Sequence, residues 1–410
     1  MQRAMSDQPK DLTPGQRVAW HRVRRGLSQE VLAGLVGRTE DWLSKIENDR
    51  AALDRVSVIR SLADALGISV LDIIGEPMSN GAPSGPVGLA EVRAALTDYR
   101  QLSPLLSAIE AEHNPPRLDM LRRDLSHVMG AYQESRYGEM LRLLPPLLTQ
   151  TRLATSEYTG DDRHAADRLA AFASQSAAMI LTKFGETDLA WIAAQRGLGS
   201  AERSEDPAVI GSLFRSAIHV LYSLGRLTDS TMMTGRASDF LRRELDPKAP
   251  GIVSIYGTLL LPGAVAAARA GDRLTAAEYL DEADEMATHL GADANHLWTA
   301  FGPTNVKIHR VVTAMALGDV PIALKLIPTI DVTGLPAERR VRHSLEVVNA
   351  YHARNQVAEA IKVLLNSERR APEQVHEHVM SRQLVLKLRG TVLGKKSKHL
   401  ADLARRMKVI

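Results

Sequence analysis

The sequence predicts an all-helical protein built from a small N-terminal domain and a longer array of paired helices. Ala, Leu, Arg and Glu, which all favour helices, dominate the 410 residues, and aromatic residues make up only 4%. Apolar residues recur at helical spacing through most of the chain. Short turns that contain Gly or Asn separate the helical segments. A chain of this length is expected to divide into two or more folding units.

Five short helices are predicted between residues 12 and 74. Gly26 and Gly37 would end the first two, because glycine readily takes the left-handed conformation at a helix C-terminus. Ser28 and Thr39 stand where a side-chain oxygen would cap the second and third helices. Apolar residues at helical spacing predict the buried faces: Val31, Leu32, Leu35, Leu43, Ile46, Ile59, Leu62, Ala63, Leu71, Ile73 and Ile74.

The run GLSQEVLAGLVGRTEDWLSKIEND, followed by LADALGISVLDII, resembles the lambda-repressor or XRE-type helix-turn-helix family. The resemblance covers about 63 residues and implies a five-helix domain whose third helix enters the major groove of double-stranded DNA. It implies that Gln29 holds a phosphate at the start of the second helix. The residues that would face bases or the adjacent backbone are Thr39, Glu40, Asp41, Ser44 and Lys45, with Arg38, Asn48 and Arg50 at the flanks.

The charge of this domain departs from what strong DNA binding requires. Residues 1–77 hold eleven Lys and Arg and eleven Asp and Glu, so the domain is neutral. Glu40 and Asp41 could accept a hydrogen bond from cytosine, or they could instead stabilise the N-terminus of their own helix. The second role is favoured for Glu40 and both stay open for Asp41. A neutral monomer should bind DNA weakly, so a homodimer is expected.

The segment from Gly75 to Gly88 is rich in Gly, Pro and Ser and predicts a flexible hinge. We therefore expect a DNA-binding domain at 1–77, a linker at 78–88 and a helical repeat domain at 89–410. In the last, turns recur at Tyr137-Gly138, Gly185-Glu186, Gly225-Arg226, Gly271-Asp272, Gly318-Asp319 and Asn355-Gln356.

The segments around these turns resemble degenerate tetratricopeptide repeats. About six helix pairs and a terminal helix, Pro372 to Arg389, would form a right-handed superhelix with a concave face suited to an elongated partner. Small residues would let the helices of a pair approach closely; these are Ala190, Ala193, Ala276, Ala277 and Ala323.

Together, the two parts resemble bacterial regulators of the peptide-sensing type and a group of actinobacterial XRE regulators. The resemblance implies that a peptide or small-molecule effector in the repeats controls DNA binding. Two stripes of side chains are candidates to line that site, the first being Arg215, His219 and Tyr222, and the second Trp298, Phe301, Asn305 and His309. The amide of Asn305 could grip a peptide backbone. The alternative is that these residues pack between repeats or cap helices.

Several function classes are not supported by the sequence. The chain has no cysteine and no histidine pattern typical of a metal site. It also has no phosphate-binding glycine loop and no catalytic motif. We therefore expect that the protein binds no cofactor and no metal and is not an enzyme. No signal peptide is recognisable, and apolar runs such as Leu259 to Ala268 are too short to span a membrane. The expectation is a cytoplasmic, homodimeric transcription regulator. The alternative is a protein-interaction scaffold in which both parts bind protein partners.

Overall fold

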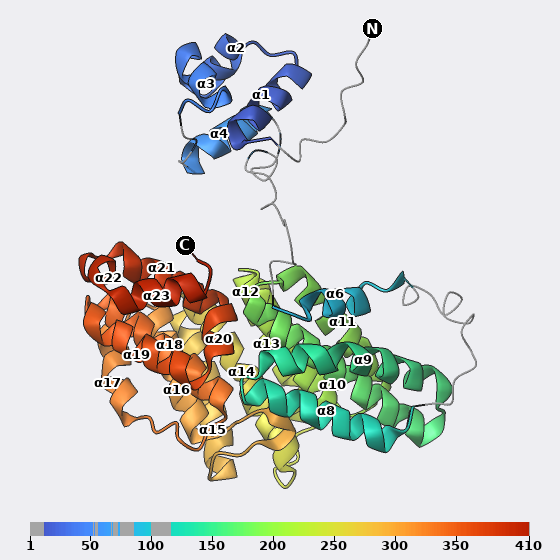
Figure 1. The fold of residues 1–410 in the computed structure, drawn as a ribbon. Coiled ribbons are helices and arrows are strands. Elements are labelled where there is room, and N and C mark those ends of the chain that lie inside the picture. Colours follow the sequence, from blue (N-terminus) through green and yellow to red (C-terminus); the bar gives the residue numbers. More distant parts are fainter. Residues whose placement is uncertain are drawn as a thin grey trace. The chain divides into compact units, whose positions relative to one another are not determined.

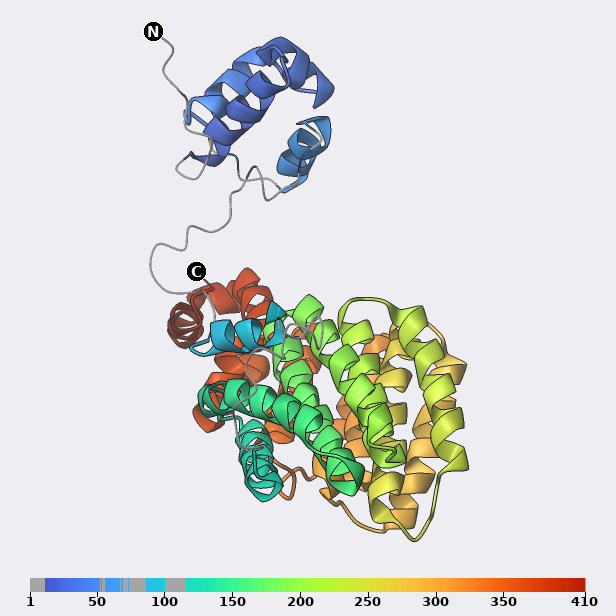
Figure 2. The ribbon, with the colours of Figure 1, turned by 90° about the vertical axis from the view of Figure 1, so that its right-hand side faces the viewer.

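In the computed structural model, the chain divides into two compact units, Met1–Gly85 and Pro86–Ile410. The structure describes residues 12–51, 53, 56–66, 68, 73, 86–99 and 116–409. Every regular element in these ranges is a helix, which confirms the all-helical class (Figures 1 and 2). The linker expected at 78–88 falls largely outside the described residues, so its bounds stay a prediction.

The N-terminal unit contains four helices whose bounds are given: α1 (Pro14–Arg24), α2 (Gln29–Leu35), α3 (Glu40–Glu47) and α4 (Val56–Leu66). Ser28 and Thr39 cap α2 and α3, as predicted, by accepting from the backbone N–H groups of Val31 and Trp42. Gly26 and Gly37 take the left-handed conformation after α1 and α2. Thr13 forms an unpredicted capping box with Gln16 at the start of α1.

The core of this unit matches the prediction on α3 and α4 and differs on α2. Leu32 is buried as predicted, but Val31 and Leu35, also expected inside, are 49% and 62% exposed, and Ala33 is buried instead. Val31 and Leu35 are four residues apart and lie on the same side of α2. Each residue turns the helix by about 100°, so an inward face centred on Leu32 and Ala33 leaves that side toward solvent. Ile73 is buried, whereas Leu71 and Ile74 lie outside the described residues.

A glycine fixes how closely α1 and α3 approach. A Cβ atom on Gly15 would lie 2.0 Å from the carbonyl oxygen of Ile46, a separation that no side chain could occupy. The backbone of α1 therefore rests directly on the C-terminal turn of α3. This contact, with Leu43 and Ile46 facing inward, holds α3 with its other face toward solvent.

The second unit begins with α6 (Leu89–Leu96), and its described residues then form six helix pairs, the number predicted. The pairs are α8 (Leu118–Gln133) with α9 (Tyr137–Glu157), α10 (Gly160–Phe184) with α11 (Thr187–Arg203), α12 (Pro207–Ser223) with α13 (Leu227–Arg243), α14 (Pro250–Arg269) with α15 (Arg273–Leu290), α16 (Pro303–Ala316) with α17 (Val320–Leu326), and α18 (Ala337–Ala353) with α19 (Val357–Arg370). The last helices are α20 (Pro372–Glu377), α21 (Val379–Gly390), α22 (Val392–Lys396) and α23 (Lys398–Arg406).

Five of the six predicted turns lie at the predicted residues. Each has one residue in the left-handed region, with φ from 59° to 84°; these are Gly185, Gly225, Gly271, Gly318 and Asn355. The prediction of the first turn was wrong, because Gly138 lies inside α9 and the left-handed residue is Ser135, with φ 61°. The turns were predicted from glycine and asparagine residues. A serine at the left-handed position is missed by this criterion, which selects the next glycine, Gly138, instead.

The single terminal helix predicted from Pro372 to Arg389 is wrong, because the helix is interrupted at His378. This residue has extended backbone angles, and its Nδ1 accepts a hydrogen bond from the backbone N–H of Met380 at 3.0 Å. The side chain thus caps α21 at the point where α20 ends. Histidine is an unusual cap, so a pattern of Ser, Thr, Asp or Asn does not reveal it.

The first and last helix pairs of the repeat unit meet each other. α18 contacts α8, and α20 contacts α9, so the orange and red helices lie beside the teal ones in Figure 1. The hydroxyl of Ser135 donates to Gln374 at 2.7 Å, and the backbone N–H of Gly138 donates to Glu373 at 2.7 Å. The superhelix therefore curves far enough for its two ends to touch.

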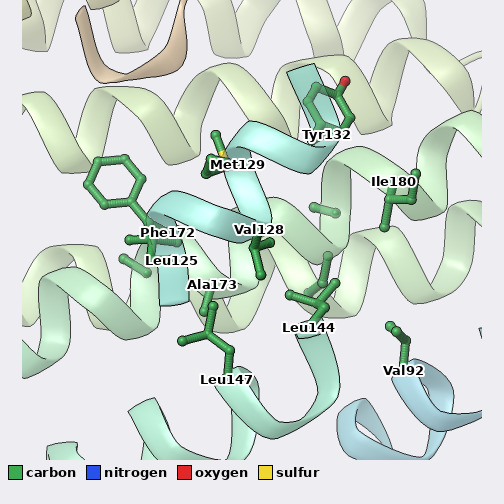
Figure 3. Close-up of a cluster of buried hydrophobic side chains, with 14 of the residues drawn as sticks. Val92, Leu125, Val128, Met129, Tyr132, Leu144, Leu147, Phe172, Ala173 and Ile180 are labelled. Atoms are coloured by element: carbon green, nitrogen blue, oxygen red, sulfur yellow. The ribbon is translucent and has the colours of Figure 1, made fainter. Parts of the chain in front are cut away.

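The repeat core consists of several clusters of buried apolar residues, one of which extends from α6 to α12. Side chains from α6, α8, α9 and α10 converge in Figure 3, among them Val92, Val128, Leu144 and Phe172. Of the small residues predicted to permit close packing, Ala190, Ala193, Ala276 and Ala323 are buried, whereas Ala277 is exposed, so its prediction is wrong.

One helix in the described ranges, α14, has the length and apolar composition to cross a membrane, although its apolar run was expected to be too short. However, 94% of that stretch is buried among the other helices. Its apolar surface is thus already covered by α12, α13 and α15, as in the core helix of a helical array.

Candidate DNA interface and candidate ligand site

The outer face of α3 carries the residues that the helix-turn-helix resemblance selected. Glu40, Asp41 and Lys45 are exposed and Ser44 is half-buried, whereas Leu43, Ile46 and Glu47 point into the unit. The structure thus gathers the polar residues on one face. Thr39 caps the helix, and Asn48 follows it with its amide donating to the carbonyl of Ser44 at 2.8 Å.

Lys45 is not free on this face. Its ammonium lies 2.6 Å from the carboxylate of Asp41, one turn earlier, and both side chains are largely exposed. An exposed pair of this kind contributes at most about 1 kcal/mol and opens readily. Glu40 lies in the first turn of α3, where the helix dipole stabilises a negative charge.

Gln29 lies at the N-terminus of α2, with its side-chain amide turned toward the protein. The amide donates to the buried Glu47 at 2.6 Å, and Glu47 also accepts from Arg22 at 2.6 and 2.7 Å. This network joins α1, α2 and α3. The hydrogen bond from Arg22 to Glu47 raises the pKa of Arg22. This network was not predicted; its one signal in the sequence is that Glu47 stands next to the inward-facing Ile46.

The flanking arginines are exposed. The guanidinium of Arg38 lies 5.7 Å from the centre of the Trp42 ring, and Arg50 follows the C-terminus of α3. All nine residues of the predicted DNA interface therefore belong to α3, its two ends or the start of α2.

A second set of charged side chains gathers inside the repeat unit. We call it the basic cluster and define it as Lys183, Arg215, Glu338, Arg339, Arg342 and Glu346. These residues lie on α10, α12 and α18, each the first helix of its pair. We call the side of these first helices that carries the cluster the inner face, as in repeats whose first helices line a concave surface.

The two carboxylates of the basic cluster are already paired. Lys183 lies 2.5 Å from Glu338, and both are buried. Burial alone would raise the pKa of Glu338, but Lys183 and Arg339 outweigh it and lower that pKa to about 2. Arg342 lies 2.8 Å from Glu346 and also contacts the sulfur of Met380. The Lys183–Glu338 pair joins α10 to α18, across the place where the ends of the repeat unit meet.

Arg215 and Arg339 have no carboxylate within hydrogen-bond distance among the described residues. The Nε atoms of both are buried without a partner, and the nearest carboxylate oxygen to Arg339 belongs to Glu338, at 4.0 Å. Burial, followed by the charge of Arg339, lowers the pKa of Arg215 to about 10. Four cations thus face two carboxylates in this cluster.

The other members of the first predicted stripe border the basic cluster. The ring of His219 is accessible to solvent, but the surrounding helices displace part of its hydration, and this loss, followed by the charges of Lys183 and Arg342, lowers its pKa. The ring of Tyr222 is buried, 4.3 Å below the guanidinium of Arg269. His309, on α16, is half-buried, and burial and then Arg339 lower its pKa to about 3. Arg215, His219 and His309 are therefore brought together with α18.

Two residues of the second stripe, Trp298 and Phe301, do not share a helix with His309, and Asn305 is turned inward at the start of that helix. Trp298 belongs to a short 3-10 turn (His296–Trp298) and packs against Phe172. Phe301 is fully buried, and Asn305 is buried with its amide donating to the carbonyl of Ala300 at 3.0 Å. Phe301 and Asn305 hold the start of α16 in place, which is a packing role.

No group of His, Cys, Asp and Glu residues with the geometry of a metal site occurs in the part of the chain that the structure describes. His376, instead, lies 2.8 Å from Glu368, which also pairs with Arg406. These contacts tie α23 to α19 and α20.

Residues 15–72 match the family profile of a helix-turn-helix domain. This segment is a helix-turn-helix domain. The match covers α1 to α4 and includes the whole turn between α2 and α3. No curated protein matches the chain significantly.

Solved structures of low similarity include Bacillus thuringiensis PlcR in complex with the peptide PapR7 and DNA, at 12% identity over 68% of this chain and 95% of that one, with a TM-score of 0.30. A Rap protein complexed with Competence and Sporulation Factor has 14% identity over 95% and 100%, and a TM-score of 0.39. ComR from S. thermophilus, with DNA and its signalling peptide ComS, has 14% identity over 75% and 99%, and a TM-score of 0.26. All three TM-scores are too low to assign a function to this chain.

Proposed function

We propose that this chain is a sequence-specific, homodimeric transcription regulator of the cytoplasm, in which an effector bound by the repeats controls DNA binding. The DNA-binding domain is residues 1–77, the linker 78–88 and the repeat domain 89–410. The observation that carries the proposal is the polar outer face of α3 within a helix-turn-helix domain. In that fold the second helix of the motif reads the major groove.

A dimer supplies the affinity that one neutral domain lacks. Each copy would contact one half-site, and the half-sites would lie about one DNA turn apart, or a multiple of it. The repeat domain holds the two copies together and contains the effector site. The effector acts by favouring one relative placement of the two DNA-binding domains.

The effector site is the inner face around Arg215, His219 and His309. These side chains approach the charged residues of α18, and His219 is open to solvent. Tyr222 and Trp298 border this face through their packing. A peptide or a small molecule is the class of effector that such an inner face accommodates.

The test of the DNA interface is Lys45→Ala in the full chain, measured by gel shift on genomic fragments enriched by footprinting. The variant loses one phosphate contact, so it should bind more weakly, and the dependence of its affinity on salt should be shallower by about one unit of slope. Its folding should be unchanged because Lys45 is exposed. Unchanged affinity and salt slope would contradict this assignment.

Asp41→Asn is the matched variant on the same face, because it removes a negative charge and releases Lys45 from its ion pair. It should bind DNA more tightly at low salt. Gln29→Ala should also weaken binding, but its amide bonds the buried Glu47, so its unfolding midpoint must be measured beside the gel shift.

The second candidate is a protein-interaction scaffold, which the neutral charge and the exposed Asp41 favour. A scaffold forms no specific DNA complex and shows no salt-dependent footprint. The same footprinting experiment therefore decides between the two functions.

A further inference from the structure

The basic cluster has an excess of positive charge for which the described residues provide no partner. Lys183 uses Glu338, and Arg342 uses Glu346. Arg215 and Arg339 remain: both residues are half-buried, each has a buried Nε without a hydrogen-bond partner, and Arg339 comes no closer than 4.0 Å to Glu338. An unpaired buried cation is costly, and buried charges in proteins are normally paired. The charge of Arg339 acts on Arg215, so an anion near both would pair with the two guanidinium groups.

The chemistry of the two groups defines the class of anion. A guanidinium presents a planar fork of N–H donors that matches the two oxygens of a carboxylate or phosphate. Neighbouring side chains offer further donors that add no charge. The hydroxyl of Tyr137 is buried and unpaired, and its ring stacks on that of Tyr132 at 6.1 Å. His219 offers an exposed ring on the same helix as Arg215.

We propose that Arg215 and Arg339 bind an oxyanion group, a carboxylate or a phosphate, carried by the effector. This inference rests on the proposed function for its biological role, although the anion site itself does not need DNA. Arg215 lies on α12 and Arg339 on α18, so the bound anion bridges the two halves of the repeat unit beside the Lys183–Glu338 pair. Glu338 keeps Lys183 in place, and the two arginines bind the ligand.

The probes are citrate, inorganic phosphate, and a randomised heptapeptide pool prepared with either free or amidated C-termini. Each is added to the full chain at an ionic strength matched with sodium chloride, and the thermal unfolding midpoint of the repeat unit is measured. At least one oxyanion should raise the midpoint above the chloride value. Which probe acts distinguishes the sources: a peptide C-terminus, a small carboxylic acid or a phosphate.

Arg215→Gln and Arg339→Gln test the two binding groups. Each should weaken binding of the active probe by about tenfold or more, the loss expected for a charged hydrogen bond, and the double variant should lose the shift. Arg215→Gln should also leave the chloride midpoint unchanged or raise it, because it removes a half-buried cation whose Nε has no hydrogen-bond partner. A merely structural arginine would instead lower it.

The matched control is Arg310→Gln on α16, whose guanidinium is paired with Asp281 and Asp284 on α15. It should keep the full oxyanion shift. The inference is overturned if no probe raises the wild-type midpoint, or if the double variant responds as the wild type does. Loss of DNA binding alone, with the oxyanion shift intact, would contradict the proposed function and leave the anion site standing.

Discussion

Two buried histidines in the repeat unit have lowered pKa values, and one of them caps a helix. Burial lowers the pKa of His343 to about 4, and burial and then Lys183 lower that of His378 well below its usual value. Both side chains are buried, and the neutral ring of His378 caps α21 through its unprotonated Nδ1. Protonation would remove that cap and place a charge beside Lys183 and Arg342.

These histidines predict a pH dependence of stability. Their pKa values in the folded state lie below those of an unfolded chain, near 6.5, so the unfolded state binds more protons as the pH falls. The unfolding free energy of the repeat unit should be flat above pH 7 and fall from about pH 6.5 downward, by about 1.4 kcal/mol per pH unit for each buried neutral histidine. Urea unfolding between pH 7 and 5 measures this slope.

His378→Asn is the variant that isolates one group, since asparagine caps a helix without titrating. Its slope below pH 6.5 should be shallower than that of the wild type. An identical slope would show that His378 does not titrate between the folded and unfolded states in this range.

Some of the closest contacts between helices are made at glycines, and the local sequence does not predict these positions. α14 is buried along nearly its whole length, and a Cβ atom on its Gly257 would lie 2.0 Å from Cζ of Phe301. Phe301 is itself fully buried, so its ring cannot move aside without disturbing other core residues. This contact determines how closely the segment before α16 packs on α14.

Gly257→Ala should therefore destabilise the repeat unit by about 1 to 3 kcal/mol, because the added methyl overpacks a filled core. Chemical unfolding of the full chain measures the loss. Gly251→Ala on the same helix is the control: its added Cβ would have no neighbour nearer than 3.7 Å, and alanine favours the helix, so stability should hold or rise slightly. Equal effects of the two substitutions would contradict the close contact.

In the repeat unit as a whole, the first helix pair contacts the last helices of the array. Besides Ser135–Gln374, hydrogen bonds of 2.9 Å join Gln133 on α8 to Asn295 in the segment before α16, and Lys183 on α10 pairs with Glu338 on α18. These contacts link residues more than a hundred positions apart. These contacts hold the first two pairs against later parts of the array, beside the basic cluster.

Lys183→Met should cost about 3 to 5 kcal/mol of unfolding free energy, because it leaves Glu338 buried without a partner. Lys183→Met combined with Glu338→Gln should recover part of this loss, since no charge is then stranded. The double-mutant cycle measures the coupling between the two ends. Additive losses would show that the pair does not join them.

Local sequence patterns were enough to predict the all-helical class, six helix pairs, five of their turns and the caps of α2 and α3. Each of these depends on neighbours within a few residues: helical spacing, a glycine after the last turn, a hydroxyl before the first. The DNA-facing residues were selected by resemblance, and the structure adds that Gln29 and Lys45 already have partners in Glu47 and Asp41.

The curvature of the repeats, in contrast, brings together residues that no local pattern connects. Lys183, Glu338 and Arg339 carried no signal in the sequence, because Lys183 and Glu338 are 155 positions apart and each is an ordinary charged residue in its own helix. The same holds for Ser135 as a turn residue and His378 as a cap. Their roles depend on long-range packing, in which small angles between successive helix pairs accumulate until the two ends of the array touch.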